Sequence, residues 1–306
     1  MLDPEHRPDP TPSPIVRVTV SNTYPPRIQA FRSCMIDDLP RVPNDRASRA
    51  LLEAMPTQRL ILAFLTWRLR RIPSKPRTVR LWSGGVTPLE FRATKSKLRA
   101  LLQKVESGDD LTPHLSDLVM TKGIILPGAS PKVRGKDIDM ILTRYGLHHF
   151  HVGDFSPGTP KGRSGRLVFA EVLDRDFRII AIADHGVFKL GSPEQIRFSG
   201  ICHSYIAKDF SPGTSFMLNP VMSSGHSMLV SILARKCEDE INRIDHLLDD
   251  PDFIDRLYKG QPILRDGLIV ARPDNPSLEW HVEDLQFGIL DRQTMVFFSI
   301  FPFLAR

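Results

Sequence analysis

Apolar and polar positions repeat in ways that change along the chain. Residues 1–14 are rich in proline and charge and are expected to be disordered, because they offer few apolar side chains to bury. Residues 15–21 then alternate apolar and polar side chains, which predicts a half-buried strand. From residue 46 to residue 71, apolar side chains recur at helical spacing, and Pro56 interrupts them. This pattern predicts two helices or one kinked helix, since proline removes a backbone donor.

Two further helical stretches have clear apolar stripes. One begins near Pro88, which follows Thr87, and runs to about Ser107. The other covers residues 227–248. After it, the chain returns to strand-like runs, namely GLIVAR, LEWHV, QFGIL and TMVFFSIF.

The middle of the chain has the clearest succession of elements. Asp137 is predicted to cap a short helix that ends at Gly146, a residue suited to the left-handed conformation of a helix terminus. Three strands are predicted to follow, at residues 147–152, 166–173 and 177–185. A helix followed by a strand, a loop and a hairpin predicts a central antiparallel sheet packed by helices. The predicted fold class is therefore α+β.

These patterns divide the chain into four predicted regions. They are a disordered lead (1–14), a basic and mostly helical N-terminal region (15–134), an α+β core (135–200) and a C-terminal region of mixed helix and strand (201–306).

Three histidines fall within the first strand of the predicted core. Two-residue alternation places His149 and His151 on one face of this strand and His148 on the other, apolar face. His148 is therefore interpreted as a core residue. His185 ends the third strand and is expected to approach the two-histidine face if its strand pairs nearby.

Two arginines stand next to this predicted face, because Arg163 and Arg166 enter the second strand from a glycine-rich loop. Histidine transfers protons near neutral pH, and the arginine fork matches phosphate. A metal-independent ribonuclease needs one group to remove the ribose 2′-hydroxyl proton, one to protonate the leaving oxygen and a cation to hold the phosphorane. The predicted catalytic residues are therefore His149, His151, His185, Arg163 and Arg166.

Charge is unevenly placed along this basic chain, whose formal net charge is +6. Seven basic residues and no acidic residue lie between Arg59 and Arg80, and the helix from Pro88 carries further basic residues on its outer face. This distribution predicts a surface that binds nucleic-acid phosphates. Its candidate residues are Arg68, Arg70, Arg71, Lys75, Arg77, Lys95 and Arg99.

Two features qualify this predicted surface. Trp67 and Trp82 lie within or beside it, where they either stack on bases or belong to the core. Residues 238–256 contain eight acidic and two basic residues, and folding this segment back on the basic region would hide the surface.

Composition argues against secreted proteins, membrane proteins and disulfide-rich scaffolds. The hydrophobic share of 41% and the charged share of 25% are typical of soluble globular proteins. Three scattered cysteines without a CxxC pair indicate a reducing compartment. No apolar run is long enough to cross a bilayer and the N-terminus has no apolar signal core, so a cytoplasmic location is expected. The sequence contains no P-loop, no GxGxxG after a strand, no GxSxG and no HExxH.

The central segment resembles two groups of bacterial proteins. Gly165-Arg166-Leu167-Val168-Phe169, followed by Phe177-Arg178-Ile179-Ile180, is similar to the strand unit of RelE-type toxin ribonucleases in the wider barnase, colicin and EndoU-like superfamily. This resemblance covers residues 147–187 and implies an RNA substrate, no cofactor and cleavage through the 2′-hydroxyl. An antitoxin protein is a candidate partner under the same resemblance. The stretches DLTPHLS and YGLHHFHVG resemble a second group, which shares an HHxHxG motif and by itself implies no activity.

Three hypotheses of function follow. The first is a metal-independent endoribonuclease of the toxin or defence type, in which His149 and His151 exchange protons. The second is a non-enzymatic nucleic-acid-binding module. The third is a metal-dependent hydrolase that binds a metal ion through His149, His151 and His185, with Asp184 orienting a ligand.

Overall fold

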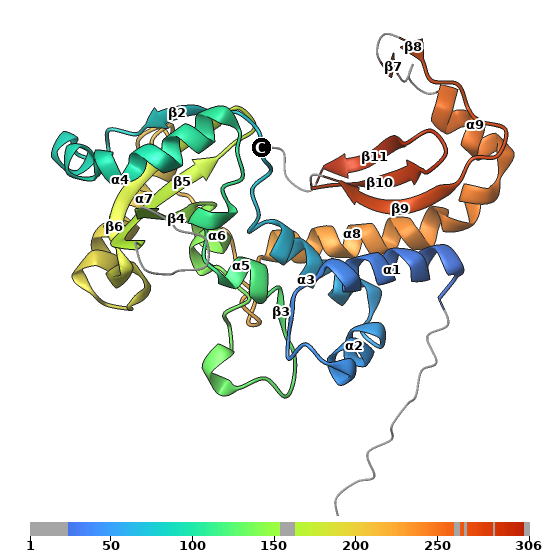
Figure 1. Ribbon diagram of the computed structural model, residues 1–306, viewed down its shortest axis with the longest axis horizontal. Coiled ribbons are helices and arrows are strands. Elements are labelled where there is room, and N and C mark those ends of the chain that lie inside the picture. The colour runs from blue at the N-terminus through green and yellow to red at the C-terminus, as the bar shows by residue number, and fades with distance from the viewer. Residues whose placement is uncertain (1–23, 154–162, 260–263, 266–267, 284, 303–306) are drawn as a thin grey trace, which may run out of the picture.

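The computed structural model describes residues 24–153, 163–259, 264–265, 268–283 and 285–302, and Figure 1 shows how they are arranged. The predicted disordered lead (1–14) and the predicted strand at residues 15–21 lie outside the described residues. Helices and sheets both contribute to the packing, so the fold is α+β, as the sequence predicts.

A four-stranded sheet forms the centre of one packed unit. Its order is β2 (Thr78–Leu81), β6 (Asp176–Asp184), β5 (Arg163–Val172) and β4 (His148–Gly153). The last three strands pair antiparallel, as predicted, whereas β2 pairs parallel with β6. The sequence patterns missed β2, because it is short and most of its side chains are exposed.

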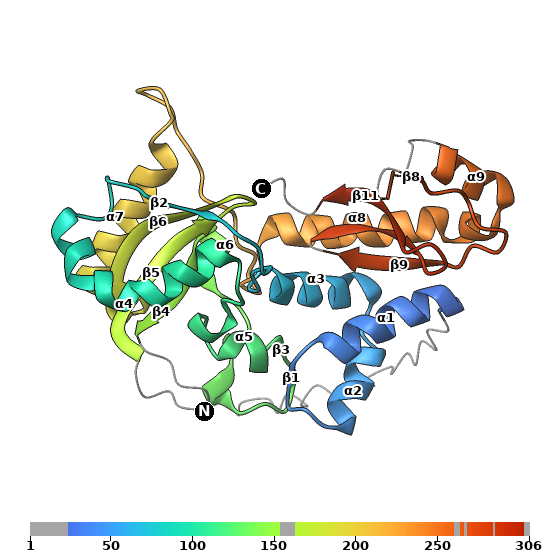
Figure 2. The same ribbon diagram turned by 45° about the horizontal axis from the view of Figure 1, so that its top comes forward.

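Helices cover both faces of this sheet, as Figure 2 shows. On one face, α4 (Pro88–Ser107) packs on a cluster of buried side chains that includes Phe150. On the other face, α7 (Pro193–Ala207) packs on a cluster that includes Phe169. Since both faces are covered, the middle of β6 is buried on both sides and does not alternate between apolar and polar residues.

The start of α4 agrees with the prediction from Thr87 and Pro88. Thr87 Oγ1 accepts a hydrogen bond from the Glu90 N–H (3.1 Å), and the Glu90 carboxylate accepts one from the Thr87 N–H (2.9 Å). Gly108 ends the helix in the left-handed conformation, with φ of 82°.

The short helix before β4 begins later than predicted. Asp139, not Asp137, caps α6 (Met140–Tyr145), and its carboxylate accepts hydrogen bonds from two backbone N–H groups of the helix. The prediction for Asp137 is wrong because its carboxylate instead accepts a hydrogen bond from the Ile125 N–H (3.0 Å). Gly146 ends α6 with φ of 69°, as predicted.

The two ends of the described chain meet in a second packed unit (Figure 1). Its helices are α1 (Pro26–Asp38), α2 (Arg46–Glu53), α3 (Thr57–Arg68), α8 (Met228–Ile244) and α9 (Pro251–Lys259). Its antiparallel sheet has the order β11 (Val296–Pro302), β10 (Gln286–Asp291), β9 (Leu278–Glu283). Pro56 separates α2 from α3, so the two-helix prediction is confirmed, and α8 packs along α3 at the start of the basic run.

Smaller elements complete the described part of the chain. They are β1 (Arg41–Val42), η1 (Thr112–His114), α5 (Leu118–Thr121), β3 (Ile124–Ile125), η2 (Pro131–Val133), η3 (His185–Phe188), η4 (Asp245–Asp249), β7 (Leu264–Arg265) and β8 (Leu268–Ile269).

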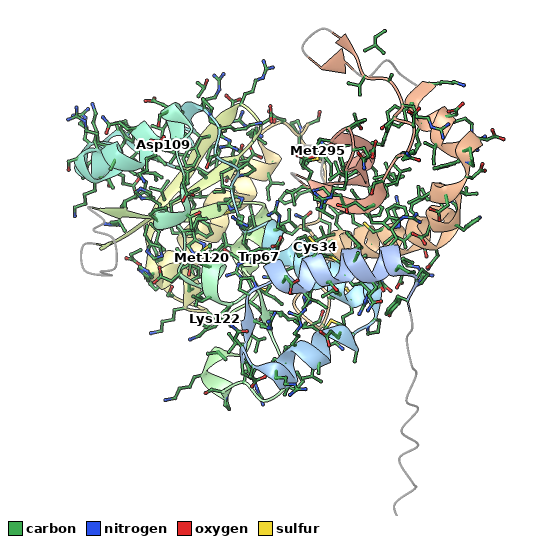
Figure 3. All side chains as sticks on the ribbon, turned by 45° about the vertical axis from the view of Figure 1, so that its right-hand side comes forward. Cys34, Trp67, Asp109, Met120, Lys122 and Met295 are labelled. Carbon is green, nitrogen blue, oxygen red and sulfur yellow. The ribbon has the colours of Figure 1, made fainter. Side chains whose placement is uncertain are left out.

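Packing divides the chain differently from the predicted regions. Residues 28–67 and 230–289 share one core with Leu126, whereas residues 72–205 form the clusters on the two faces of the four-stranded sheet. The predicted boundaries at residues 134 and 200 therefore do not separate independent cores. Among the described residues, no helix has the length and apolar character that spanning a membrane requires. All three cysteines are free thiols, and Cys34 on α1 is exposed (Figure 3).

Arg32 explains why the sequence patterns missed α1, since this charged residue belongs to the buried face of the helix. Its guanidinium donates hydrogen bonds to Thr57 Oγ1 (2.8 Å) and to the carbonyls of Glu53 (2.9 Å) and Met55 (2.6 Å). Burial lowers the pKa of Arg32, and the nearby Tyr24 and Glu238 partly offset this effect. Arg32 thus joins α1 to the end of α2 and the start of α3.

The substitution Arg32→Met is expected to lower the free energy of unfolding by about 3 kcal/mol, because it leaves buried acceptors without a donor. Urea unfolding followed by circular dichroism measures this loss. Arg49→Met is the matched control, because Arg49 makes exposed ion pairs with Asp37 and Glu53. Equal losses for the two variants would contradict the role given to Arg32.

Candidate functional site

The histidines of β4 lie on the two faces that alternation predicts. His149 faces the α7 side, where its ring centroid lies 6.2 Å from that of Phe169 and 6.2 Å from that of His151. His148 is buried, and its ring centroid lies 6.3 Å from that of Phe150, a residue of the core under α4. The interpretation of His148 as a core residue therefore agrees with its position.

Asp139 holds the first histidine of this face. His149 Nδ1 lies 3.0 Å from Asp139 Oδ2, and both side chains are largely shielded from solvent. Burial acts to raise the pKa of Asp139, but the hydrogen bond and positive charge of His149, with a helix N–H, outweigh it, so the pKa is lowered overall. A carboxylate this close to Nδ1 favours one orientation of the ring, in which Nε2 is the nitrogen that takes a proton.

The rings of the other two predicted histidines lie next to each other. The ring centroids of His151 and His185 lie 5.6 Å apart, with an interplanar angle of 37°. His151 is 8% exposed, and its backbone carbonyl lies 3.1 Å from Nδ1 of His114. His185 begins η3 and is exposed. The structure thus brings the three predicted histidines to one side of the sheet.

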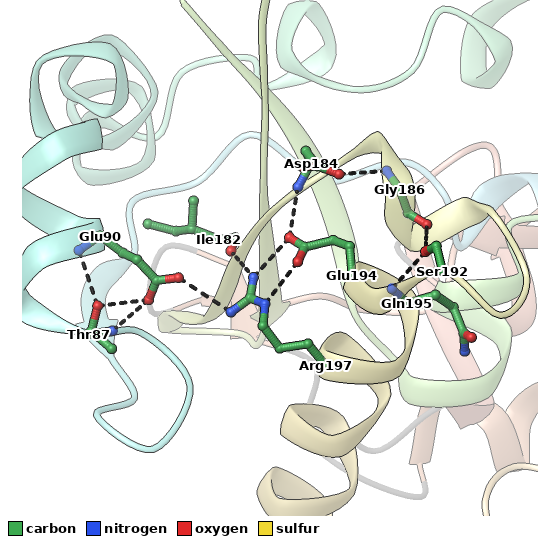
Figure 4. Close-up of polar contacts among 9 residues, drawn as sticks. All are labelled: Thr87, Glu90, Ile182, Asp184, Gly186, Ser192, Glu194, Gln195 and Arg197. Carbon is green, nitrogen blue, oxygen red and sulfur yellow. Dashed lines mark hydrogen bonds and ion pairs between the residues drawn. The ribbon is translucent and has the colours of Figure 1, made fainter.

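A network of hydrogen bonds fixes the turn that carries His185 (Figure 4). The Asp184 carboxylate accepts a hydrogen bond from the Gly186 N–H (2.7 Å), so Asp184 fixes the turn. Glu194 accepts a hydrogen bond from the Asp184 N–H (3.2 Å) and forms an ion pair with Arg197 (2.9 Å). Arg197 also pairs with Glu90 at the start of α4 (3.3 Å). The turn of His185 is therefore tied to helices on both faces of the sheet.

A cavity of about 760 Å³ opens on the histidine side, between α6, η3 and the start of α7. His149, His151 and His185 line it. So do Asp139, three cations and several apolar side chains; the cations are Arg70, Lys136 and Arg144. Its volume lies within the roughly 300–1,000 Å³ of pockets that hold small ligands. Proton-transfer groups and cations therefore share one cavity.

The predicted arginines of β5 do not supply these cations. Leu167 pairs with His151 and belongs to the cluster on the α7 side, so alternation places Arg166 on the opposite face. Arg166 is exposed and lies across from Asp184 in the sheet register. Arg166 therefore does not share the histidine face and does not line the cavity, so its position gives no support to its predicted catalytic role. Arg163 pairs with Gly153 in the backbone, and its side chain lies outside the described residues.

Arg70 takes part in the site, but in a different way from its prediction as a surface residue. It is 5% exposed and donates hydrogen bonds to the carbonyls of Lys122 (2.8 Å) and Asp137 (2.9 Å). Its Nε is buried and has no hydrogen-bond partner among the described residues. Burial lowers the pKa of Arg70, and the negative charges of Asp139 and Asp137 partly offset this effect.

The remaining predicted nucleic-acid-binding residues do not form one surface. Arg77 is buried and donates to the Leu173 carbonyl (2.9 Å), and Lys75 pairs with Asp174. The guanidinium groups of Arg68 and Arg71 lie over aromatic rings of α3. Lys95 and Arg99 are exposed on α4, on the sheet face away from the histidines.

The two tryptophans belong to the packing. Trp67 is buried where α3 meets α5, and its Nε1 donates to the Val119 carbonyl (2.8 Å; Figure 3). The Trp82 ring packs edge-on against Tyr205, with centroids 5.1 Å apart. These positions favour the core interpretation over base stacking.

A preformed metal site is not found among the described residues, since no group of three His, Cys, Asp or Glu side chains has the geometry to hold a metal ion. The hypothesis of a metal-dependent hydrolase thus gains no support from the positions of His149, His151 and His185.

Comparison with known proteins gives no match: no family model, curated protein or solved structure is significantly similar to the chain. The resemblances to RelE-type ribonucleases and to HHxHxG proteins therefore stay predictions.

The ionised form of Asp139 is expected to stabilise the fold. Its pKa is lower in the folded chain than in the unfolded chain, so this contribution is present above the unfolded value of about 3.9 and disappears as the pH falls through the folded value. Asp139→Asn, which keeps a helix-capping side chain, should lower the urea midpoint at pH 7 and reduce its loss on acidification. An unchanged acid dependence in the variant would contradict the stabilising ion pair with His149.

Proposed function

We propose that this protein is an endoribonuclease of the toxin or defence type that cleaves RNA through the ribose 2′-hydroxyl. The observation that carries the proposal is the position of His149, whose Nδ1 lies 3.0 Å from Asp139 Oδ2 inside a cavity with two more histidines. An oriented imidazole can act as general base, and a neighbouring imidazolium as general acid. The resemblance of the central segment to RelE-type ribonucleases supports the same chemistry.

The reaction begins when His149 Nε2 takes the proton of the 2′-hydroxyl. The 2′-oxygen then attacks phosphorus, and the bond between phosphorus and the 5′-oxygen of the next nucleotide breaks. The protonated member of the His151–His185 pair gives its proton to that leaving oxygen. The products are a 2′,3′-cyclic phosphate and a 5′-hydroxyl, and the proton taken by His149 balances the one given up.

Cations of the cavity stabilise the extra charge of the phosphorane. Arg70 is suited to this task, because it lines the cavity and backbone carbonyls anchor its guanidinium there. A positive charge that is already held in place needs no reorganisation when negative charge develops near it. Lys136 and Arg144 are exposed at the cavity and attract the phosphate backbone.

His149→Ala is expected to abolish cleavage of a single-stranded RNA, and Asp139→Asn to lower kcat by about 10²- to 10⁴-fold, because the ring loses its orienting acceptor. Gel electrophoresis of end-labelled RNA follows the reaction. His246→Ala, which removes an exposed histidine of η4 in the other unit, should leave cleavage unchanged. RNA with a 2′-deoxy nucleotide at the cleaved position should resist cleavage. Full activity of His149→Ala would overturn the proposal.

The rate of cleavage should follow a bell-shaped pH profile, because one histidine must be neutral and another protonated. Of the variants His151→Ala and His185→Ala, the one that loses the proton donor should lose the fall in rate at high pH. The comparison uses kcat/KM measured from pH 5 to pH 9. A profile that keeps both limbs in both variants would exclude this pair as the source of the proton.

A second candidate function is binding of nucleic acid without cleavage. The observation that favours it is the exposed basic face of α4, where Lys95 and Arg99 lie away from the cavity. Binding that weakens steeply with salt, is lost on charge reversal of Lys95 and Arg99 and has no turnover would support it over the endoribonuclease.

A further inference from the structure

An exposed aromatic ring stands at the mouth of the histidine cavity. Phe188, the last residue of η3, is 52% exposed and lines the cavity. Its ring centroid lies 5.3 Å from that of His149 and 6.3 Å from that of His185. Leu190, which also lines the cavity, is 92% exposed. The proton-transfer groups are therefore bordered by an apolar rim that no described part of the chain covers.

The surroundings of this ring indicate a ligand that has both a flat ring and a negative charge, and not a purely apolar ligand. Three histidines and the cations Lys136 and Arg144 line the same cavity, so a ligand that reaches Phe188 also meets imidazole and positive charge. Nucleotides combine a flat apolar ring with a phosphate, and aromatic side chains that stack on bases are common in proteins that bind single strands.

The turn holds Phe188 in place before any ligand arrives. The carboxylate of Asp184 caps η3, and Ser192 Oγ donates a hydrogen bond to the Gly186 carbonyl (2.6 Å), as Figure 4 shows. These bonds fix the segment that carries both His185 and Phe188. A base stacked on Phe188 would thus be held at a set distance from the histidines.

We propose that Phe188 stacks on the nucleobase next to the cleaved phosphodiester and so makes the enzyme selective for single-stranded RNA. This inference rests on the proposed function, and it adds the substrate class and the residue that selects it. A base on Phe188 must leave its place in a helix, since paired and stacked bases do not present a free face. Duplex RNA of the same sequence is therefore a poor substrate.

The test measures binding and cleavage separately. Binding uses a fluorescent single strand with 2′-O-methyl riboses, which has no free 2′-hydroxyl, and cleavage uses the matching RNA. Phe188→Leu keeps the apolar contact and removes the aromatic ring, and it is expected to weaken binding by about tenfold, within the range of a lost base–aromatic stack. Phe188→Trp keeps an aromatic ring and should bind the strand as tightly as the wild-type protein. Phe210→Leu is the control, because Phe210 is 44% exposed and lies outside the cavity lining, and it should leave binding and cleavage unchanged.

An abasic site next to the cleaved bond provides the decisive experiment, because its first comparison uses the wild-type protein alone. It should weaken binding to the wild-type protein as much as Phe188→Leu does, and should cause no further loss in that variant. The pH profile of cleavage should stay the same in Phe188→Leu, since a loss of stacking does not change proton transfer.

The outcomes distinguish base stacking on Phe188 from the proposed endoribonuclease activity. Cleavage of RNA with equal binding of intact and abasic strands by the wild-type protein would overturn stacking and leave the endoribonuclease intact. Stacking-dependent binding without cleavage would support Phe188 and overturn the endoribonuclease. A shifted pH profile in Phe188→Leu would mean that the ring only positions His149, which contradicts the proposal.

Discussion

The alternation of side chains along β4 is the constraint on which both the core and the candidate site depend. β4 is one of the two edge strands of the sheet, and Phe150 fills the core under α4 while His149 and His151 face the other way. A slip of one residue relative to β5 would turn both histidines into the core under α4 and Phe150 towards the cavity, so the core fixes the register. On the histidine side, α7 packs on β6, and α6 contacts β4. The cavity forms where the cover of the sheet changes from α7 to α6.

Hydrogen bonds from outside β4 hold the groups that line this cavity. Asp139 links the start of α6 to His149, and Arg197 links α4 and α7 to the turn before His185. The first link is local, since α6 directly precedes β4, whereas the contact of Arg197 with Glu90 spans 107 positions of the sequence. Groups fixed in this way need little rearrangement when a ligand binds, which is the condition for strong electrostatic catalysis. The covered sheet therefore serves as the rigid support of the site.

Local patterns predicted the parts of the structure that depend on neighbouring residues. Alternation separated His149 from His148, and Thr87 with Pro88 marked the start of α4. The register between strands is a different matter, because it decides that Leu167, and not Arg166, shares a face with His151. Asp139 and Phe188 were missed because only the folded chain shows that they line the cavity, and Arg70 was predicted as a surface residue although it is buried.

Placement, and not number, decides what the basic residues can do. Arg70 and Arg77 are buried and bind backbone carbonyls, whereas Lys95 and Arg99 stay exposed on α4. The sheet and its helices separate α4 from the cavity, so α4 cannot contact a phosphate held there. Its charges act through the field alone, which salt screens over about 10 Å at 0.1 M. In the proposed endoribonuclease, α4 would therefore raise only the rate at which RNA encounters the protein. The cations of the cavity would stabilise the charge on the reacting phosphate.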